Sequence, residues 1–248
     1  MAINGQVASI GATLDPDNDV VTLDGEAVNA ARPVYWVLHK PAGVLSTASD
    51  PERRQTVLDL LPPHGQRLFP VGRLDRDTRG LLLITNDGPW AHALLHPSHE
   101  VEREYRVEVR GHVTPHTVER LSRGIVLEGR RTAPAKVSQL RVKSDHSATR
   151  FHLTLIEGRK RQIRNVCAAL GHRVLELTRI RMGPLRLGNL KEGASRKLSR
   201  KEHQELSQLV ERSQERTGNW SASEGGNRRP RSGSRQTSKR TRKDGATS

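Results

Sequence analysis

Residues 71–88 read VGRLDRDTRGLLLITNDG, a short charged loop followed by an apolar run and a turn. The apolar run, residues 81–85, is typical of a strand that is buried on both faces of a sheet. The Asn-Asp-Gly triplet after it is a turn signal that ends the strand. Because a buried strand can anchor the loop before it, we expect this glycine-bounded loop to present Asp75 over a cleft.

The loop itself is rich in charge. Asp75 and Asp77 stand two residues apart, so their side chains point the same way if the loop is extended. Arg73, Arg76 and Arg79 surround them, and nearby positive charge lowers the pKa of a carboxyl group and keeps it ionised. A solvated surface loop with local ion pairs would have the same pattern, so the spacing alone fits both a catalytic and a structural role.

Strand and helix signals are interleaved along the rest of the chain. The apolar periodicity and the turn and capping residues predict strands at 34–39, 104–110, 135–142, 149–156 and 174–182, and helices at 90–95, 115–124, 161–170 and 199–210. Several neighbouring strands, such as 135–142 and 149–156, look like antiparallel hairpins. The sequence therefore predicts an α+β fold, with a mixed, largely antiparallel sheet flanked by helices.

The composition divides the chain into three parts. Residues 1–32 contain short strand signals at 7–10, 20–23 and 26–28, separated by turn residues. Residues 33–212 carry the interleaved strand and helix signals and form the main domain. Residues 213–248 form a basic tail of Gly, Ser, Arg and Lys with few apolar residues, which we expect to be disordered.

The net charge points to a polyanionic partner. The chain of 248 residues carries a formal charge of +15. Residues 221–248 contain eight Lys or Arg and two acidic residues, a net +6, which leaves +9 on the preceding 220 residues. A body this basic favours nucleic acid or an anionic membrane surface as its partner.

Cysteine and hydropathy exclude several other classes of protein. The single cysteine, Cys167, excludes a disulfide framework and a zinc site built from several thiolates, and the scattered histidines predict no metal site. No apolar stretch reads as a signal peptide or reaches the roughly 18 residues that a membrane span needs. We therefore expect a cytoplasmic protein that does not enter a membrane.

Five segments, in order along residues 33–210, resemble one known family. They are LHKPAGV at 38–44, GRLDRDTRGLLLITNDG at 72–88, EYRV at 104–107, EGRKRQIR at 157–164 and GPLRLGNL at 183–190. Together they look like the motifs of the RsuA/RluB-type ribosomal RNA pseudouridine synthases. The resemblance implies that family's catalytic fold and an isomerase that turns uridine into pseudouridine without a cofactor.

The resemblance also implies roles for single residues. The aspartate after Gly-Arg-Leu is the family's catalytic residue, which corresponds to Asp75. Tyr105 would stack against the target base, and Arg164 would form an ion pair with Asp75. Either Leu185 or Leu187 would pack near the base. The predicted RNA-binding residues are Arg73, Arg76, Thr78, Arg159, Lys160, Arg161 and Leu187.

The chain departs from the family's pattern at its start. Relatives usually begin with an S4-type RNA-binding domain of helices followed by strands, whereas residues 3–25 resemble only its terminal strands. We interpret residues 1–32 as a truncated S4-type remnant that is poorly ordered or pairs with the catalytic sheet. The segment 179–185 looks closer to enzymes of the large ribosomal subunit, so 23S rRNA is the expected substrate, with 16S rRNA as the alternative. Pre-ribosomal particles are further candidate partners, and we expect a monomer.

Two other functions remain open at this point. An rRNA-binding assembly factor without catalysis would keep the basic charge and the fold but would have no use for Asp75. A metal-dependent nuclease built on Asp75 and Asp77 would need further carboxylate ligands. The combination of Asp75, Tyr105 and Arg164 favours the synthase over both.

Overall fold

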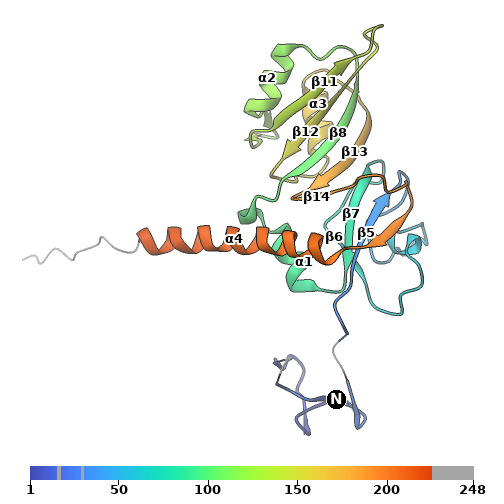
Figure 1. The fold of residues 1–248 in the computed structure, drawn as a ribbon, viewed down its shortest axis with the longest axis vertical. Helices are drawn as coiled ribbons and strands as arrows, with labels where there is room; N and C mark the ends of the chain where they lie inside the picture. Colours follow the sequence, from blue (N-terminus) through green and yellow to red (C-terminus); the bar gives the residue numbers. More distant parts are fainter. Residues whose placement is uncertain (16–17, 29–30, 225–248) are drawn as a thin grey trace, which may run out of the picture.

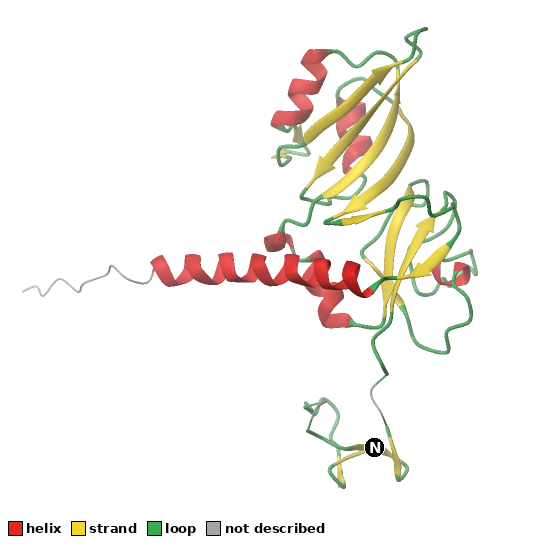
Figure 2. Ribbon diagram, viewed as in Figure 1, coloured by secondary structure: helices red, strands yellow, loops and turns green. Residues whose placement is uncertain are grey.

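The computed structural model describes residues 1–15, 18–28 and 31–224, and a twisted nine-stranded sheet forms its centre (Figures 1 and 2). The strand order is β11-β12-β8-β13-β7-β5-β15, with β14 on β13 and β6 on β7. The strands are β5 Tyr35–Lys40, β6 Phe69–Val71, β7 Arg79–Thr85, β8 Arg103–Arg110, β11 Lys136–Val142, β12 Ala148–Leu155, β13 Val174–Met182, β14 Leu185–Arg186 and β15 Ser195–Lys197. All these pairings are antiparallel except that of β13 with β7, which confirms the predicted α+β class.

Helices flank the two halves of the sheet. The helices are α1 Gly88–Leu95, α2 Pro115–Arg123, α3 Gln162–Ala169 and α4 Arg200–Glu224; the short elements are η1 Val57–Leu60, η2 Pro97–His99 and the hairpin β9 Val126–Leu127 with β10 Arg130–Arg131. The predicted cap of α2 is present, since the Thr114 hydroxyl accepts a hydrogen bond from the Thr117 amide. Figure 1 shows α2 and α3 beside β8, β11, β12 and β13, and α1 and α4 beside β5, β6 and β7.

The core has three apolar clusters. One joins β8, β12 and β13 to α2 and α3. The other two lie on opposite faces of the β5–β7 pair: Leu81 and Leu83 point toward α1 and α4, whereas Leu82 and Ile84 point toward η1. All four side chains are at most 1% exposed, so β7 is buried on both faces as its sequence predicts.

The two halves of the sheet meet along a narrow seam. Strands β7 and β13 pair in parallel through only two residue pairs, Thr178 with Arg79 and Arg179 with Gly80. Since β7 directly follows the charged loop, this seam places Asp75 between the two halves of the molecule. Gly80 has φ +114°, a backbone conformation that favours glycine.

The N-terminal residues form a small sheet of their own. Its strands, in the order β2-β1-β3-β4, are β1 Ala2–Ile3, β2 Gln6–Val7, β3 Val21–Leu23 and β4 Glu26–Ala27. The predicted strand at 7–10 is wrong beyond residue 7, because Ile10 is fully exposed and has no apolar surface to pack on. The predicted pairing with the catalytic sheet is also wrong, and Figure 1 shows this segment apart from the main body. Its described residues contain no helix.

The last helix is longer than its apolar pattern predicts. Val210 is the last buried residue of α4 among those whose side chains are described, and we expected the helix to stop there, yet it continues to Glu224. Residues 211–217 are mostly Glu, Arg and Gln, which propagate a helix without needing a buried face. The predicted tail therefore begins inside α4, and residues 225–248 lie outside the described part of the chain.

Candidate active site

A cleft of about 870 Å³ opens beside the charged loop. Five stretches line it: residues 45–54, the 73–78 loop, strand β8, residues 155–163 and strand β13. Eight of the ten predicted site residues lie along it, namely Arg73, Asp75, Arg76, Thr78, Tyr105, Arg159, Lys160 and Arg161. Segments far apart in the sequence thus converge on the loop that carries Asp75.

The backbone on both sides of Asp75 is held in place. The Ser46 hydroxyl donates to the Leu74 carbonyl at 2.9 Å and accepts from the Leu74 amide at 3.2 Å. The Thr78 amide donates to the Asp75 carbonyl at 3.0 Å, which closes a turn around the two intervening residues. Because Leu74 is itself buried in the core, the position of Asp75 is set by packing as well as by hydrogen bonds.

The buried side chain of Lys40 anchors the second half of the same loop. Its side chain is fully buried, and Nζ donates to the carbonyl oxygens of Pro41, Arg76 and Thr78 at 2.9, 3.1 and 2.9 Å. Burial lowers the pKa of Lys40 to about 8, although the charges of Asp77 and Asp75 oppose this change. The ammonium group is therefore still protonated at neutral pH, with three donors for three carbonyls.

Lys40→Met should show what this buried ammonium contributes. We expect a loss of about 2 kcal/mol in the free energy of unfolding, since three carbonyl oxygens lose a donor while the cost of burying a charge is removed. The rate of product formation should fall about 100-fold, because a loop shifted by about 1 Å misplaces the carboxylate. Urea unfolding and single-turnover rates measure the two effects, with Lys191→Met, an exposed lysine, as control. An unchanged rate would show that Lys40 does not position the loop.

Arg161 is the cation nearest to Asp75. Its Nη1 lies 3.9 Å from Asp75 Oδ2, and both side chains remain partly exposed to the cleft. Arg161 is the N-cap residue of α3 and has a left-handed backbone with φ +50°, which allows its side chain to project over the loop. Sequence reasoning had assigned Arg161 only to RNA contacts.

The predicted ion pair between Arg164 and Asp75 is not formed in this structure. Arg164 lies one helical turn further into α3, and its Nη2 donates to the Asp77 carbonyl at 3.1 Å instead. Burial lowers the pKa of Arg164, and the negative charges of Asp77 and Asp75 act against that shift. Arg164 thus holds the backbone of the loop through the Asp77 carbonyl and adds positive charge near both aspartates.

Tyr105 borders the cleft from the middle of β8. The side chain is half-buried and packs against two of the apolar clusters, one in each half of the sheet. Because Tyr105 also lines the cleft, part of its ring is accessible to a ligand. A ring fixed in this way can stack on a planar base with little loss of conformational entropy.

The comparisons with known proteins agree with this geometry. The model of the family "RNA pseudouridylate synthase" matches residues 34–169, which include the Asp75 loop, Tyr105 and Arg164. The chain belongs to this family. A relative from Bacillus subtilis (strain 168), "Ribosomal large subunit pseudouridine synthase B", is 38% identical over 84% of this chain and 86% of its own length. A protein of the same name from Pseudomonas aeruginosa is 41% identical over 84% of this chain and 55% of its own. A solved structure, "Crystal structure of pseudouridylate synthase", has a TM-score of 0.65 at 31% identity and covers 83% of this chain and 87% of that one.

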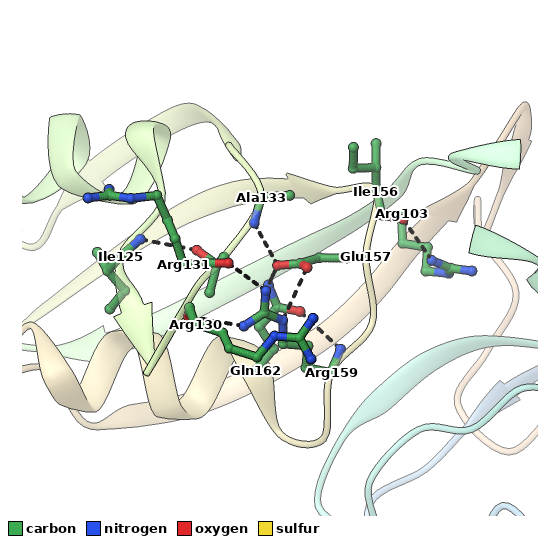
Figure 3. A network of polar contacts seen from close by, with 10 residues as sticks. Arg103, Ile125, Arg130, Arg131, Ala133, Ile156, Glu157, Arg159 and Gln162 are labelled. Atoms are coloured by element: carbon green, nitrogen blue, oxygen red, sulfur yellow. Dashed lines mark hydrogen bonds and ion pairs between the residues drawn. The ribbon is translucent and has the colours of Figure 1, made fainter. Parts of the chain in front are cut away.

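A network of polar contacts shapes one wall of the synthase's cleft (Figure 3). The Glu157 carboxylate accepts hydrogen bonds from the Ala133 amide, from Gln162 Nε2 and from Arg159 Nε. The two Nη atoms of Arg159 donate to the carbonyls of Arg130 and Arg131 in the β9–β10 hairpin. The guanidinium that we predicted to bind phosphate is therefore occupied in holding this hairpin against the cleft.

Two other predicted residues serve the interior of the synthase. Thr78 is buried, its carbonyl accepts from Lys40, and its hydroxyl has no hydrogen-bond partner. Leu187 is 7% exposed in the cluster beneath α1 and α4 and does not line the cleft; Leu185 is buried in the same cluster. The expected contact of either leucine with the base is thus not supported, because apolar side chains after β13 pack into the core.

The described part of the synthase offers neither a metal-binding cluster nor a membrane-spanning helix. Within residues 1–15, 18–28 and 31–224, no three His, Cys, Asp or Glu side chains come together where they could hold a metal ion. None of the helices described is both long enough and apolar enough to cross a membrane.

Proposed function

We propose that this enzyme isomerises a uridine of large-subunit (23S) ribosomal RNA to pseudouridine, with Asp75 as the catalytic aspartate. The observation that carries the proposal is the cleft in which a doubly braced Asp75 faces Tyr105 and Arg161. The names of the Bacillus and Pseudomonas relatives support ribosomal RNA as the substrate class. We expect the enzyme to act as a monomer in the cytoplasm, on rRNA or on pre-ribosomal particles.

The reaction sets clear demands on the cleft. The N1–C1′ bond breaks, the uracil turns over and C5 bonds to C1′, while C5 loses a proton and N1 gains one. Asp75 serves as a nucleophile at C1′ or C6, or as a base at C2′. Each of these routes needs an ionised carboxylate that is poorly hydrated. Arg161 lies within ion-pair distance of that carboxylate, and Arg164 and Lys40 hold the backbone of the same loop.

The cleft suits a uridine that has left its helix. The reacting atoms are inaccessible in paired RNA, so the target nucleotide is extruded into the enzyme. Tyr105 would then stack on the uracil, and we expect it to take part in removing the C5 proton. Arg73, Arg76, Lys160 and Arg161 are exposed along the cleft and are available for phosphates of the flanking nucleotides.

Tritium release from rRNA labelled at C5 of uridine tests the function directly. Incubation with unmodified 23S or 16S transcripts, without added metal or nucleotide, should release tritium from the 23S transcript only. Release from the 16S transcript alone would move the target to the small subunit. Binding without release from free RNA or from pre-ribosomal particles would instead support an assembly factor that performs no chemistry.

The affinity for RNA should depend strongly on salt. If the four exposed basic residues of the cleft each neutralise one phosphate of a single strand, a plot of log K against log[salt] has a slope of about −3. Affinity then falls about 50-fold between 50 and 200 mM salt. Filter binding across this range gives the slope, and a flat profile would mean that the cleft does not bind the RNA backbone.

A further inference from the structure

A second cavity adjoins the catalytic cleft. It has a volume of about 570 Å³ and shares four lining residues with the cleft: Arg73, Tyr105, Glu157 and Gly158. Tyr105, which we propose to stack on the target base, is thus at the border of both cavities. The second one lies at the seam of the sheet, since it is also lined by Arg103 of β8 and Arg179 of β13.

Three arginines border this cavity without a carboxylate partner. No ion pair of Arg73, Arg103 or Arg179 occurs among the described residues. Of the two acidic residues that line the cavity, Glu157 is already held by Arg159, Gln162 and an amide. The other, Glu100, forms no ion pair in the described part of the chain. A concave site with this excess of positive charge attracts anions.

Arg179 is the most unusual of the three. Its side chain is 3% exposed, Nε donates to the Leu81 carbonyl at 2.7 Å, and Nη2 is buried without any hydrogen-bond partner. A buried guanidinium without a counter-charge is costly, so its retention needs a compensating negative charge. Its register partner on β8 is Tyr105, which places this charge beside both cavities.

Arg103 is available to supply the direct contact. Figure 3 shows it apart from the Glu157 network, with one dashed contact that runs to the Ile156 carbonyl. That hydrogen bond, from Nη1, is long at 3.4 Å. Among the described residues Arg103 has no other side-chain hydrogen bond, so its remaining donors can hold an anion in the cavity, with Arg73 at the border with the catalytic cleft.

We propose that this second cavity binds a phosphodiester of the RNA substrate, next to the target uridine, through Arg103 and Arg73 with Arg179 as a buried supporting charge. The inference rests on the proposed function, because it assumes an RNA substrate in the adjoining cleft. A phosphate held in this cavity fixes the backbone next to the extruded nucleotide, close to the tyrosine that borders both cavities. It thereby favours the flipped nucleotide over the stacked one.

The salt dependence of binding distinguishes a phosphate contact from a structural role. Affinities of wild type, Arg103→Gln and Arg103→Lys are measured between 50 and 200 mM salt on the transcript that releases tritium with wild type. We expect Arg103→Gln to make the slope shallower by about 0.7, the value for one phosphate contact on a single strand. Arg103→Lys keeps the charge and should retain the wild-type slope. Arg110→Gln, at the exposed far end of the same strand, should leave the slope unchanged.

Each result of this experiment either supports or overturns the phosphate site. An unchanged slope in Arg103→Gln, or an equal loss in Arg110→Gln, would overturn the phosphate site, because the effect would then be absent or due to net charge alone. The same loss in Arg103→Lys would also overturn it, since it would indicate a role in packing. Failure of the proposed function is separate: wild type would release no tritium from either rRNA, whatever the slopes.

Discussion

Asp75→Asn is expected to slow pseudouridine formation by at least about 10³-fold, which corresponds to about 4 kcal/mol of barrier. The amide has nearly the shape of the carboxylate but can act neither as a nucleophile nor as a base. The braces from Ser46 and Thr78 reach the backbone around Asp75 and do not depend on its side chain, so the loop should keep its position. Single-turnover rates at saturating RNA measure the chemical step without a contribution from binding.

Asp77→Asn is the matched control for this experiment. Asp77 is the other carboxylate of the loop, but it does not line the cleft, and Arg164 contacts its backbone carbonyl rather than its side chain. We expect the single-turnover rate of Asp77→Asn to fall less than tenfold. The RNA affinity of both variants should stay within about threefold of wild type. A loss below tenfold in Asp75→Asn, or equal losses in both variants, would remove Asp75 from the catalytic role.

Local patterns in the sequence were enough to predict much of this arrangement. The continuous apolar run of β7 predicted a strand buried on both faces, and its residues do divide between two clusters. The apolar periodicity of residues 104–110 predicted a strand, and in β8 Val107 and Val109 are buried in one cluster with Tyr105 packed against it. Such predictions succeed because one strand's own periodicity decides which side chains are buried.

Other features depend on contacts that one segment cannot reveal. A lysine after a strand is usually solvent-exposed, and Lys40 is buried where the carbonyls of Arg76 and Thr78, from a distant loop, join that of Pro41 around its ammonium group. Which arginine of α3 reaches Asp75 depends on the left-handed backbone of Arg161, which the periodicity of a helix does not predict. The short strands β6, β14 and β15 were missed because two or three residues are too few to show alternation.

The hydrogen bonds and ion pairs distinguish the three arginines near the start of α3. Arg159 and Arg164 look equivalent to Arg161 in the sequence, yet Arg159 holds the β9–β10 hairpin and Arg164 holds the catalytic loop. Arg161 alone of the three is within ion-pair distance of the aspartate. The positive charge around Asp75 is thus partly fixed by backbone carbonyls, which keeps it in place when RNA enters or leaves the cleft.

Gly80→Ala is expected to lower the free energy of unfolding by about 4 kcal/mol and to reduce the activity of the enzyme as well. Two costs combine: an L-residue at φ +114° is strained, and its Cβ would lie 2.5 Å from the Arg179 nitrogen and even closer to the Arg179 carbonyl oxygen. Both atoms belong to the backbone of β13, so no change of rotamer can relieve the contact. Because β7 and β13 pair through only two residue pairs, a shift there separates the halves that carry Asp75 and Tyr105.

Urea unfolding of Gly80→Ala beside Gly88→Ala tests whether the seam holds the site together. Gly88 lies at the end of the segment 71–88, which also contains Gly80. Its φ is not positive, and a Cβ added there would meet nothing within 4 Å. We expect that variant to stay within about 1 kcal/mol of wild type, as is usual for a substitution without a clash. If Gly80→Ala were as stable and as active as Gly88→Ala, β13 would have to move without cost, and the seam could not be what aligns the two walls of the cleft.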